Sequence, residues 1–143
     1  MRGINQRYVD ETYDADGLLK TYRLKYPENY NFGYDVVDDI AVNDPGRMAL
    51  VWDSQSGEEH EFTFADIKRL SDKTCNYLTS KGIGKGDFVM LVLKHSYQFW
   101  FISVALHKMG AVSVPATYML KSHDIEYRID AAGIKAAIVI ADA

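Results

Sequence analysis

Hydrophobic residues in the second half of the chain form three short runs that are typical of buried strands. The runs are FVMLVL at 88–93, AVSVP at 111–115 and AAIVIA at 136–141. Apolar runs of this length indicate strands covered on both faces, as in parallel sheets. Two segments with helical spacing separate them. The order predicts an α/β fold, the parallel βαβαβ start of a doubly wound sheet.

The two segments between these strands have helical start and stop signals. Ser96 is the expected N-cap of the first helix, which Gly110 ends, and Ser122 is the expected N-cap of the second, which Gly133 ends. The first helix has the following residues at three- and four-residue steps: Phe99, Trp100, Ser103, Leu106 and His107. Both helices are expected to pack on the sheet.

A longer helix is predicted before the first parallel strand. Thr63 is a good N-cap, and Asp66 three residues later favours the positive end of the helix. Gly82 supplies a left-handed stop. The glycines of 82–86 therefore close a helix and precede a strand, whereas a phosphate-binding loop follows a strand and opens a helix. We interpret them as turn residues.

A β-hairpin is predicted upstream of this helix. MALVWD at 48–53 and EHEFTF at 59–64 flank a turn at 54–57. We expect the hairpin to pack beside the parallel sheet rather than to join its centre. Before it, the pattern from Tyr34 predicts a helix that ends in the turn at 43–46.

The chain divides into two parts at the level of sequence. Residues 1–33 form an N-terminal arm rich in tyrosine and charge, with one short helix predicted at 17–26. Residues 34–143 are expected to be the first part of a larger domain. The last apolar run has the composition of an internal strand, which needs neighbours and cover. The domain is therefore expected to be incomplete, and the chain truncated.

The predicted core consists of apolar residues on the inner faces of these elements. They are Leu70, Leu78, Val89, Leu91, Leu93, Ile102, Leu106, Val112, Val114, Ile138 and Ile140.

Composition is that of an ordinary globular protein, with 48% hydrophobic and 25% charged residues among 143. The most apolar stretch, 99–106, is far too short to cross a bilayer. Cys75 is the single cysteine, so no internal disulfide can form, which fits a reducing compartment and predicts a cytoplasmic location. We interpret Cys75 as a structural thiol.

The net charge of −4 is unevenly distributed. Residues 1–66 carry 6 Lys/Arg against 14 Asp/Glu, and residues 67–143 carry 10 against 6. The basic second half could help to hold an anionic ligand such as a nucleotide, although a solvated surface explains it more simply. The sequence lacks a Lys/Arg cluster with interleaved aromatics, so a nucleic-acid partner is not expected.

No catalytic residue or metal site is assigned from the sequence. The four histidines show no metal-ligand spacing, and one cysteine cannot complete a zinc site. The segment after the second parallel strand is different, because ligands of open α/β sheets lie outside the carboxyl ends of the strands. Thr117, Tyr118 and Met119 follow that strand and form a candidate contact surface, with an ordinary connecting loop as the alternative.

Four segments together resemble the N-terminal portion of the AMP-forming acyl-CoA synthetases, of the adenylate-forming superfamily. They are PENYNFGYDVVDDIA at 27–41, FTFADIKRLSDKTCNYLTSKGIGKGDFVMLVL at 62–93, FWFISVALHKMGAVSVPAT at 99–117 and KSHDIEYRI at 121–129. The first and the last are most similar to the medium-chain, butyrate-type enzymes. The order and spacing of the segments carry the resemblance.

The resemblance implies a two-step ligase. A small-molecule carboxylic acid, of medium or short chain, attacks ATP to give an acyl-adenylate, and the thiol of coenzyme A then displaces AMP. Mg²⁺, backbone N–H groups and a lysine neutralise the phosphoryl oxygens in such a reaction. The family's phosphate loop, adenine motif, ribose-binding aspartate and catalytic lysine are expected beyond residue 143, so we expect the chain alone to be inactive.

The resemblance also assigns a role to the loop at 117–119. In this family the corresponding loop approaches coenzyme A, so Thr117, Tyr118 and Met119 become candidate cofactor-binding residues. Medium-chain enzymes often have glutamine at the position of Met119, which is a departure from the pattern.

A second class of function stays open. The chain could be a stand-alone, non-catalytic binding or interaction module with an α/β fold. An unpaired strand and apolar helix faces would then expose surface that favours self-association.

Overall fold

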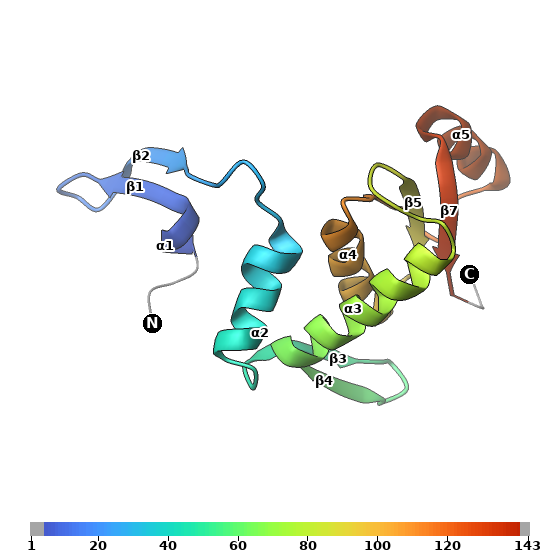
Figure 1. Cartoon of the computed structure of the whole chain (residues 1–143), viewed down its shortest axis with the longest axis horizontal. Helices are drawn as coiled ribbons and strands as arrows, with labels where there is room; N and C mark the ends of the chain where they lie inside the picture. Colours follow the sequence, from blue (N-terminus) through green and yellow to red (C-terminus); the bar gives the residue numbers. More distant parts are fainter. Residues whose placement is uncertain (1–4, 141–143) are drawn as a thin grey trace. The chain divides into compact units, whose positions relative to one another are not determined.

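The computed structural model describes residues 5–140 and divides into two units, Met1–Tyr30 and Asn31–Ala143. Figure 1 shows the elements of both. Each unit is described by itself. The first contains the short helix α1 (Asn5–Tyr8) and two strands, β1 (Val9–Tyr13) and β2 (Leu19–Leu24).

The two strands of the first unit form an antiparallel ribbon. Val9 pairs with Leu24 and Glu11 with Tyr22, and the register shifts at the end of β1. In the turn between the strands, the Asp14 carboxylate accepts hydrogen bonds from the N–H groups of Asp16 and Leu18.

The helix predicted at 17–26 is therefore wrong. The turn that begins at Asp14 brings the following residues back along β1, where cross-strand pairs replace helical contacts. Gly17 has φ +79°, which also suits a turn rather than a helix.

The second unit begins with two consecutive helical elements, the π-helix η1 (Gly33–Asp38) and directly after it the α-helix α2 (Asp39–Asn43). The helix expected from Tyr34 is confirmed, and it ends at Asn43, in the predicted 43–46 turn. Gly33 lies so close to α4 (Gln98–Met109) that a Cβ there would meet Cγ of Lys108 at 2.5 Å. Only glycine fits at that crossing.

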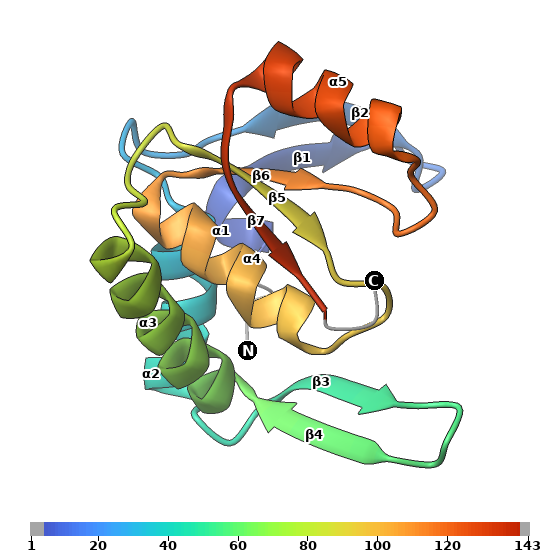
Figure 2. The same cartoon turned by 90° about the vertical axis from the view of Figure 1, so that its right-hand side faces the viewer.

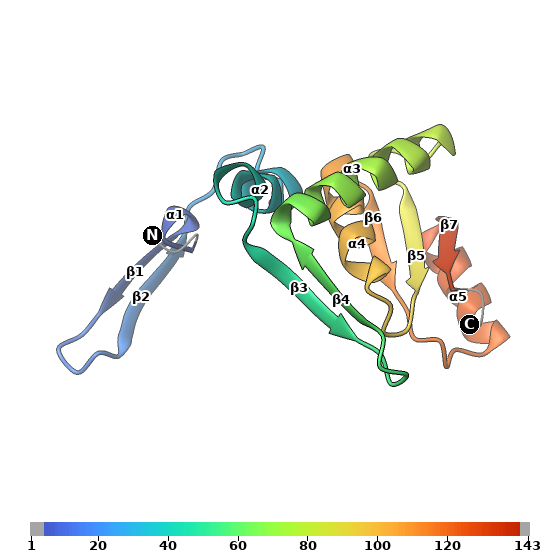
Figure 3. The ribbon, with the colours of Figure 1, turned by 90° about the horizontal axis from the view of Figure 1, so that it is seen from below.

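The predicted hairpin is confirmed as β3 (Met48–Asp53) and β4 (Glu59–Thr63). These strands form a two-stranded antiparallel sheet of their own, separate from the parallel sheet, as Figure 3 shows. The Ser54 hydroxyl accepts a hydrogen bond from the N–H of Glu58 and closes the loop.

Helix α3 (Phe64–Ser80) begins with the predicted cap. The N–H of Asp66 donates to Oγ1 of Thr63, and the N–H of Thr63 donates to the Asp66 carboxylate. The Thr63 side chain and Arg69 lower the pKa of Asp66. Gly82, with φ +79°, follows the end of the helix as predicted.

Three parallel strands form the central sheet in the order β6-β5-β7. They are β5 (Phe88–Val92), β6 (Val112–Pro115) and β7 (Ile134–Val139). Leu91 of β5 lies opposite Pro115 on one side and Ile138 on the other. Figure 2 shows β5 between its two neighbours. The predicted α/β class, with a parallel βαβαβ unit, is confirmed.

Two helices connect these strands, α4 (Gln98–Met109) and α5 (Ser122–Ala132). Both end at a left-handed glycine as predicted, Gly110 and Gly133. The expected N-caps are wrong by one residue each. Tyr97 and Lys121 occupy the cap positions, the Ser96 hydroxyl contacts Gln98, and Ser122 lies inside α5.

The third strand also differs from its prediction. It runs from 134 to 139, because Ile134 already pairs beside Phe88 directly after Gly133. Residue 141 of the predicted run lies outside the described residues.

Helices cover the sheet on both faces. Helices α3 and α4 lie on one face, and α5 lies on the other, as Figures 1 and 3 show. Residues of β5 alternate between these faces, with Val89, Leu91 and Leu93 directed to the α3–α4 side, where they form the main core cluster with Ile102 and Leu106.

Most of the predicted core is confirmed. Leu78 belongs to the same buried cluster, while Ile138 and Ile140 pack against it half-buried. Leu70 and Val114 are half-buried. The prediction that Val112 belongs to the core is wrong. Val112 lies on the α5 side of the edge strand β6 and is 38% exposed.

A buried ion cluster joins η1, α3 and α4. The side chain of Lys108 is 0% exposed, and its Nζ lies 2.6 Å from Asp38 and 2.7 Å from Asp72. Lys68 contacts the Asp72 carboxylate at 2.6 Å. Burial tends to raise the pKa of Asp72, but hydrogen bonds from Lys108 and Lys68 outweigh it and lower that pKa.

None of the helices within residues 5–140 combines the length and the apolar character needed to span a membrane.

Candidate functional site

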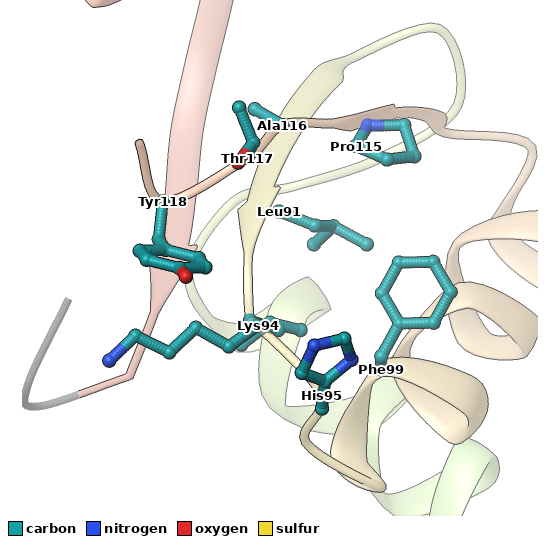
Figure 4. Close-up of a pocket in the computed structure, with 9 residues that line it drawn as sticks. Leu91, Lys94, His95, Phe99, Pro115, Ala116, Thr117 and Tyr118 are labelled. Atoms are coloured by element: carbon teal, nitrogen blue, oxygen red, sulfur yellow. The ribbon is translucent and has the colours of Figure 1, made fainter. Parts of the chain in front are cut away.

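A pocket lies where strands β5 and β6 end. Its volume is about 350 Å³, and Figure 4 shows its lining. The residues that line it are Leu91, Leu93, Lys94, His95, Phe99, Pro115, Ala116, Thr117 and Tyr118. Because parallel strands bring their carboxyl ends to one edge, the loops after β5 and β6 meet there.

The loop after β6 supplies one wall of the pocket. The N–H of Ala116 donates to the carbonyl of Leu91 at 2.9 Å, which extends the β5–β6 ladder to the start of the loop. The Thr117 hydroxyl then accepts a hydrogen bond from the N–H of Met119 at 3.3 Å. This turn places Thr117 and Tyr118 at the pocket. Met119, 72% exposed, is not among the lining residues.

The loop after β5 supplies the opposite wall through a strained turn. The N–H of Ser96 donates to the carbonyl of Leu93 at 3.0 Å, so Lys94 and His95 are the central turn residues. Lys94 has φ +48° and is the only non-glycine residue with positive φ in the described part of the chain. A left-handed conformation costs such a residue about 1–2 kcal/mol.

A second cavity, of about 530 Å³, adjoins the same turn. Lys94, His95 and Phe99 line both cavities. The remaining walls come from the hairpin strand β3 at 50–53 and from the start of α4. The turn therefore separates the two cavities.

An aromatic cluster connects the hairpin to this turn. The indole N–H of Trp52 donates to the carbonyl of His95. Tyr97 packs against Trp52, His60 and Phe62, with ring centroids 5.2, 4.7 and 5.2 Å from its own. Edge-on and tilted ring pairs at these distances are favourable. The hairpin therefore contacts the site without belonging to the parallel sheet.

The first pocket is apolar with a cationic rim. Among the residues that the structure describes, no carboxylate lines it. The Nζ of Lys94 lies 5.1 Å from the centroid of the Tyr118 ring, in a cation–π contact that joins the two loops. In Figure 4 the Lys94 side chain extends beside that ring. Such a lining suits a neutral or anionic ligand.

Among residues 5–140, no group of three or more His, Cys, Asp or Glu side chains is placed to hold a metal ion. Burial raises the pKa of the Cys75 thiol, whose Sγ donates to the carbonyl of Ala105. A thiol in that state is a poor nucleophile, in agreement with its structural interpretation.

The glycines at 82–86 are turn residues, as expected. Gly82 and Gly86 both have positive φ, and the N–H of Gly84 donates to the Asp87 carboxylate at 2.7 Å. Lys135 donates to the carbonyl of Gly82 and to the Asp87 carboxylate. The hydrogen bond from Lys135, and after it the one from the N–H of Gly84, lower the pKa of Asp87.

Comparison with known proteins identifies the family. A model described as AMP-binding enzyme matches residues 37–143. The chain belongs to the AMP-binding enzyme family. Mitochondrial acyl-coenzyme A synthetase ACSM4 of Mus musculus is 34% identical over 140 residues, which cover 94% of this chain and 24% of that protein. The chain thus spans about a quarter of the length of this relative.

Solved structures of AMP-binding enzymes share the fold. A fatty acyl CoA synthetase of Mycobacterium tuberculosis gives a TM-score of 0.69 at 28% identity, covering 76% of this chain and 21% of that one. An inhibitor-bound N-terminal domain of FACL13 from the same organism gives 0.68 at 28% identity, covering 76% of this chain and 26% of that one. The resemblance to the N-terminal part of the acyl-CoA synthetases, of the medium-chain type, is confirmed.

Sequence reasoning missed part of this pocket. It named Thr117 and Tyr118, which the structure brings to the pocket, but not Lys94, His95 or Phe99. One signal was present: Lys94 and His95 directly follow the apolar run at 88–93, and ligands of open α/β sheets lie outside the carboxyl ends of the strands. The left-handed turn at Lys94 had no glycine or asparagine to reveal it.

Proposed function

We infer that this chain forms part of an acid–thiol ligase that activates a carboxylic acid, of medium or short chain, with ATP. The carboxylate attacks the α-phosphate of ATP and releases pyrophosphate, which gives an acyl-adenylate, and the thiol of coenzyme A then displaces AMP from the acyl group. The observation that carries the proposal is the family match over residues 37–143 together with a parallel sheet of the same fold. The acyl-CoA synthetase relatives supply the class of reaction.

The loop at the end of β6 is the chain's contribution to coenzyme A binding in this proposal. Thr117 and Tyr118 line the pocket beside Lys94. Thr117 provides a hydroxyl, Tyr118 an aromatic face and Lys94 a cation. The phosphates of coenzyme A are anionic, and its pantetheine arm is long and mostly neutral, so both find complementary groups there. Met119 is exposed and does not line the pocket, so it would contact only the more exposed part of the cofactor.

The phosphoryl chemistry requires groups beyond those described. Mg²⁺ and ATP need oxygen ligands and preorganised donors around the α-phosphate. The described residues provide no metal-binding cluster. The chain by itself is therefore proposed to be inactive, with the sheet acting as scaffold and the 117–119 loop as a contact surface.

Two assays with the purified chain test this proposal. Carboxylate-dependent exchange of pyrophosphate into ATP, with butyrate or octanoate, is expected to stay at background. Calorimetry is expected to show weak or no binding of Mg²⁺–ATP. Tight, Mg²⁺-dependent ATP binding would contradict the assignment of the chain as scaffold.

A third assay tests the loop directly. Titration of ¹⁵N-labelled chain with coenzyme A is expected to shift the amide resonances of Thr117, Tyr118 and Lys94. Thr117→Val and Tyr118→Ala are expected to weaken that response, while Ser56→Ala in the hairpin turn serves as the matched control. Shifts confined to other surfaces would remove the loop from the cofactor site.

A stand-alone interaction module is the competing function. Apolar residues on the α5 face of the sheet, Val112 and Val139, are exposed, which is unfavourable for a free monomer. We therefore expect concentration-dependent self-association in sedimentation velocity. A clean, stable monomer at high concentration would favour the module.

The compartment is part of the proposal. A single thiol with a raised pKa is compatible with the cytoplasmic location expected from the sequence.

A further inference from the structure

The turn between β5 and α4 is held from two sides. On one side, the indole N–H of Trp52 donates to the His95 carbonyl, across 43 positions of sequence. On the other side, the Lys94 ammonium contacts the Tyr118 ring. The strained residue, Lys94, lies between these two contacts.

Strained backbone persists only where the surrounding structure holds it, and such residues gather at ligand sites. The His95 carbonyl belongs to the peptide directly after the turn centre, so a donor fixed on the hairpin restricts the rotation of that peptide. The donor itself is fixed, because Trp52 packs against Tyr97 and His60. The hairpin is thus a rigid support for the turn.

The direction of the Lys94 side chain depends on its own φ. At φ +48° the chain leaves the turn towards Tyr118, and its Nζ reaches the ring of the opposite loop. A relaxed turn with negative φ would redirect the same side chain. Both the boundary between the two cavities and the cationic rim of the smaller one then depend on the turn.

We propose that Trp52 is a positioning residue of the pocket: its hydrogen bond to His95 holds Lys94 in the left-handed conformation that places the ammonium beside Tyr118. The occupant of the pocket is a ligand with a phosphate group. The statement about the ligand rests on the function proposed above, whereas the coupling of Trp52 to Tyr118 does not.

Nuclear magnetic resonance of Trp52→Phe tests the coupling without any ligand. Phenylalanine keeps an aromatic ring against Tyr97 and removes the donor. The amides of Lys94, His95 and Ser96 and the ring protons of Tyr118 are expected to shift, and the Ser96 amide to exchange with solvent at least about 5-fold faster, as for the loss of one hydrogen bond. Trp100 of α4 lines the second cavity, as Trp52 does, so Trp100→Phe is the matched control. It should leave the ring resonances of Tyr118 unchanged.

A double-mutant cycle with Lys94→Gly separates positioning from simple packing. Glycine adopts positive φ without strain, so the turn no longer needs the indole to hold it. The urea midpoint shift caused by Trp52→Phe is expected to fall by at least half in the Lys94→Gly background. Additive urea midpoint shifts in the double variant would overturn the proposal. So would Tyr118 resonances that do not change in Trp52→Phe.

Coenzyme A is the probe for the ligand. Trp52→Phe is expected to weaken its binding about 5-fold, and Trp100→Phe to leave it unchanged. A wild-type chain that fails to bind coenzyme A while Trp52 and Tyr118 remain coupled would refute the function proposed for the loop and leave the positioning role supported. Binding that Trp52→Phe does not alter would refute the positioning role alone.

Discussion

The N-terminal ribbon and the parallel sheet are both built from paired strands, but only the sheet is buried. All six residues of β2 are exposed, whereas four of the five residues of β5 are buried. The ribbon depends on its turn and on cross-strand pairs, while β5 is fixed by helices and by neighbours on both sides. Strand pairing alone gives little stability in water, and burial supplies the rest.

The largest expected difference between the two regions is the response to loss of a leucine. Leu91→Ala removes a side chain that is 1% exposed in β5, and should lower the free energy of unfolding by about 2–5 kcal/mol. Leu19→Ala, the matched change in the ribbon, should cost less than about 0.5 kcal/mol. Urea denaturation followed by circular dichroism measures both. A loss below half a kilocalorie for Leu91→Ala would mean that its strand is not internal.

Loss of the buried ammonium should have the next largest effect. Lys108→Met leaves Asp38 without the partner held at 2.6 Å and should cost about 2–3 kcal/mol, below the value for a fully buried pair because Asp72 is partly exposed. Lys68 contacts the same carboxylates from a more exposed position, so Lys68→Met should lower the free energy of unfolding by about 1 kcal/mol or less. Equal effects of the two substitutions in thermal unfolding would contradict the central role of Lys108.

Acid should lower the free energy of unfolding through the same ion cluster of Lys108 and Asp72. The folded state lowers the pKa of Asp72, so the stabilisation is complete above the pKa of the unfolded chain, near pH 4, and is lost as the pH falls through the folded value. Asp72→Asn should therefore cost about 1 kcal/mol at pH 7, and the difference from wild type should shrink towards pH 3. Urea midpoints at pH 7, 5 and 3 measure this, and a gap that does not narrow would exclude Asp72 as a contributor.

Helix caps should give the smallest measurable differences. Thr63→Ala removes the acceptor for the N–H of Asp66 and should cost about 1 kcal/mol. Ser122→Ala should change stability by only a few tenths, because Lys121 rather than Ser122 occupies the cap of α5. A loss of similar size at both positions would support the cap assigned to Ser122 from the sequence.

The sequence predicted those elements whose burial leaves a periodic signal. The order of strands and helices from residue 34 onward, the cap at Thr63 and the glycine stops follow from local patterns that tertiary packing reinforces. The helix predicted at 17–26 was wrong, because an exposed ribbon has no buried face to impose an alternation of apolar and polar residues. A bulge also interrupts the register of Leu19–Leu24 against β1. The prediction of Val112 as a core residue failed for a related reason, since an edge strand has one poorly covered face.

The candidate site was predictable only in part. Thr117 and Tyr118 follow a strand with a clear apolar pattern, so their place at the sheet edge could be inferred. The turn at Lys94 depends on a hydrogen bond from the hairpin, far away in sequence, and no local signal encodes it. Long-range support of this kind becomes visible only when the segments are folded together.

The position of β5 between strands that come later in the chain has a consequence for synthesis on the ribosome. β5 emerges first, yet its second neighbour, β7, is made only after two further helices and a strand. During that interval the nascent strand has an unpaired, strongly apolar edge, which is the kind of surface that chaperones bind and that aggregates form upon. Slowing translation just before β7 should therefore lower the soluble yield more than slowing it after the hairpin.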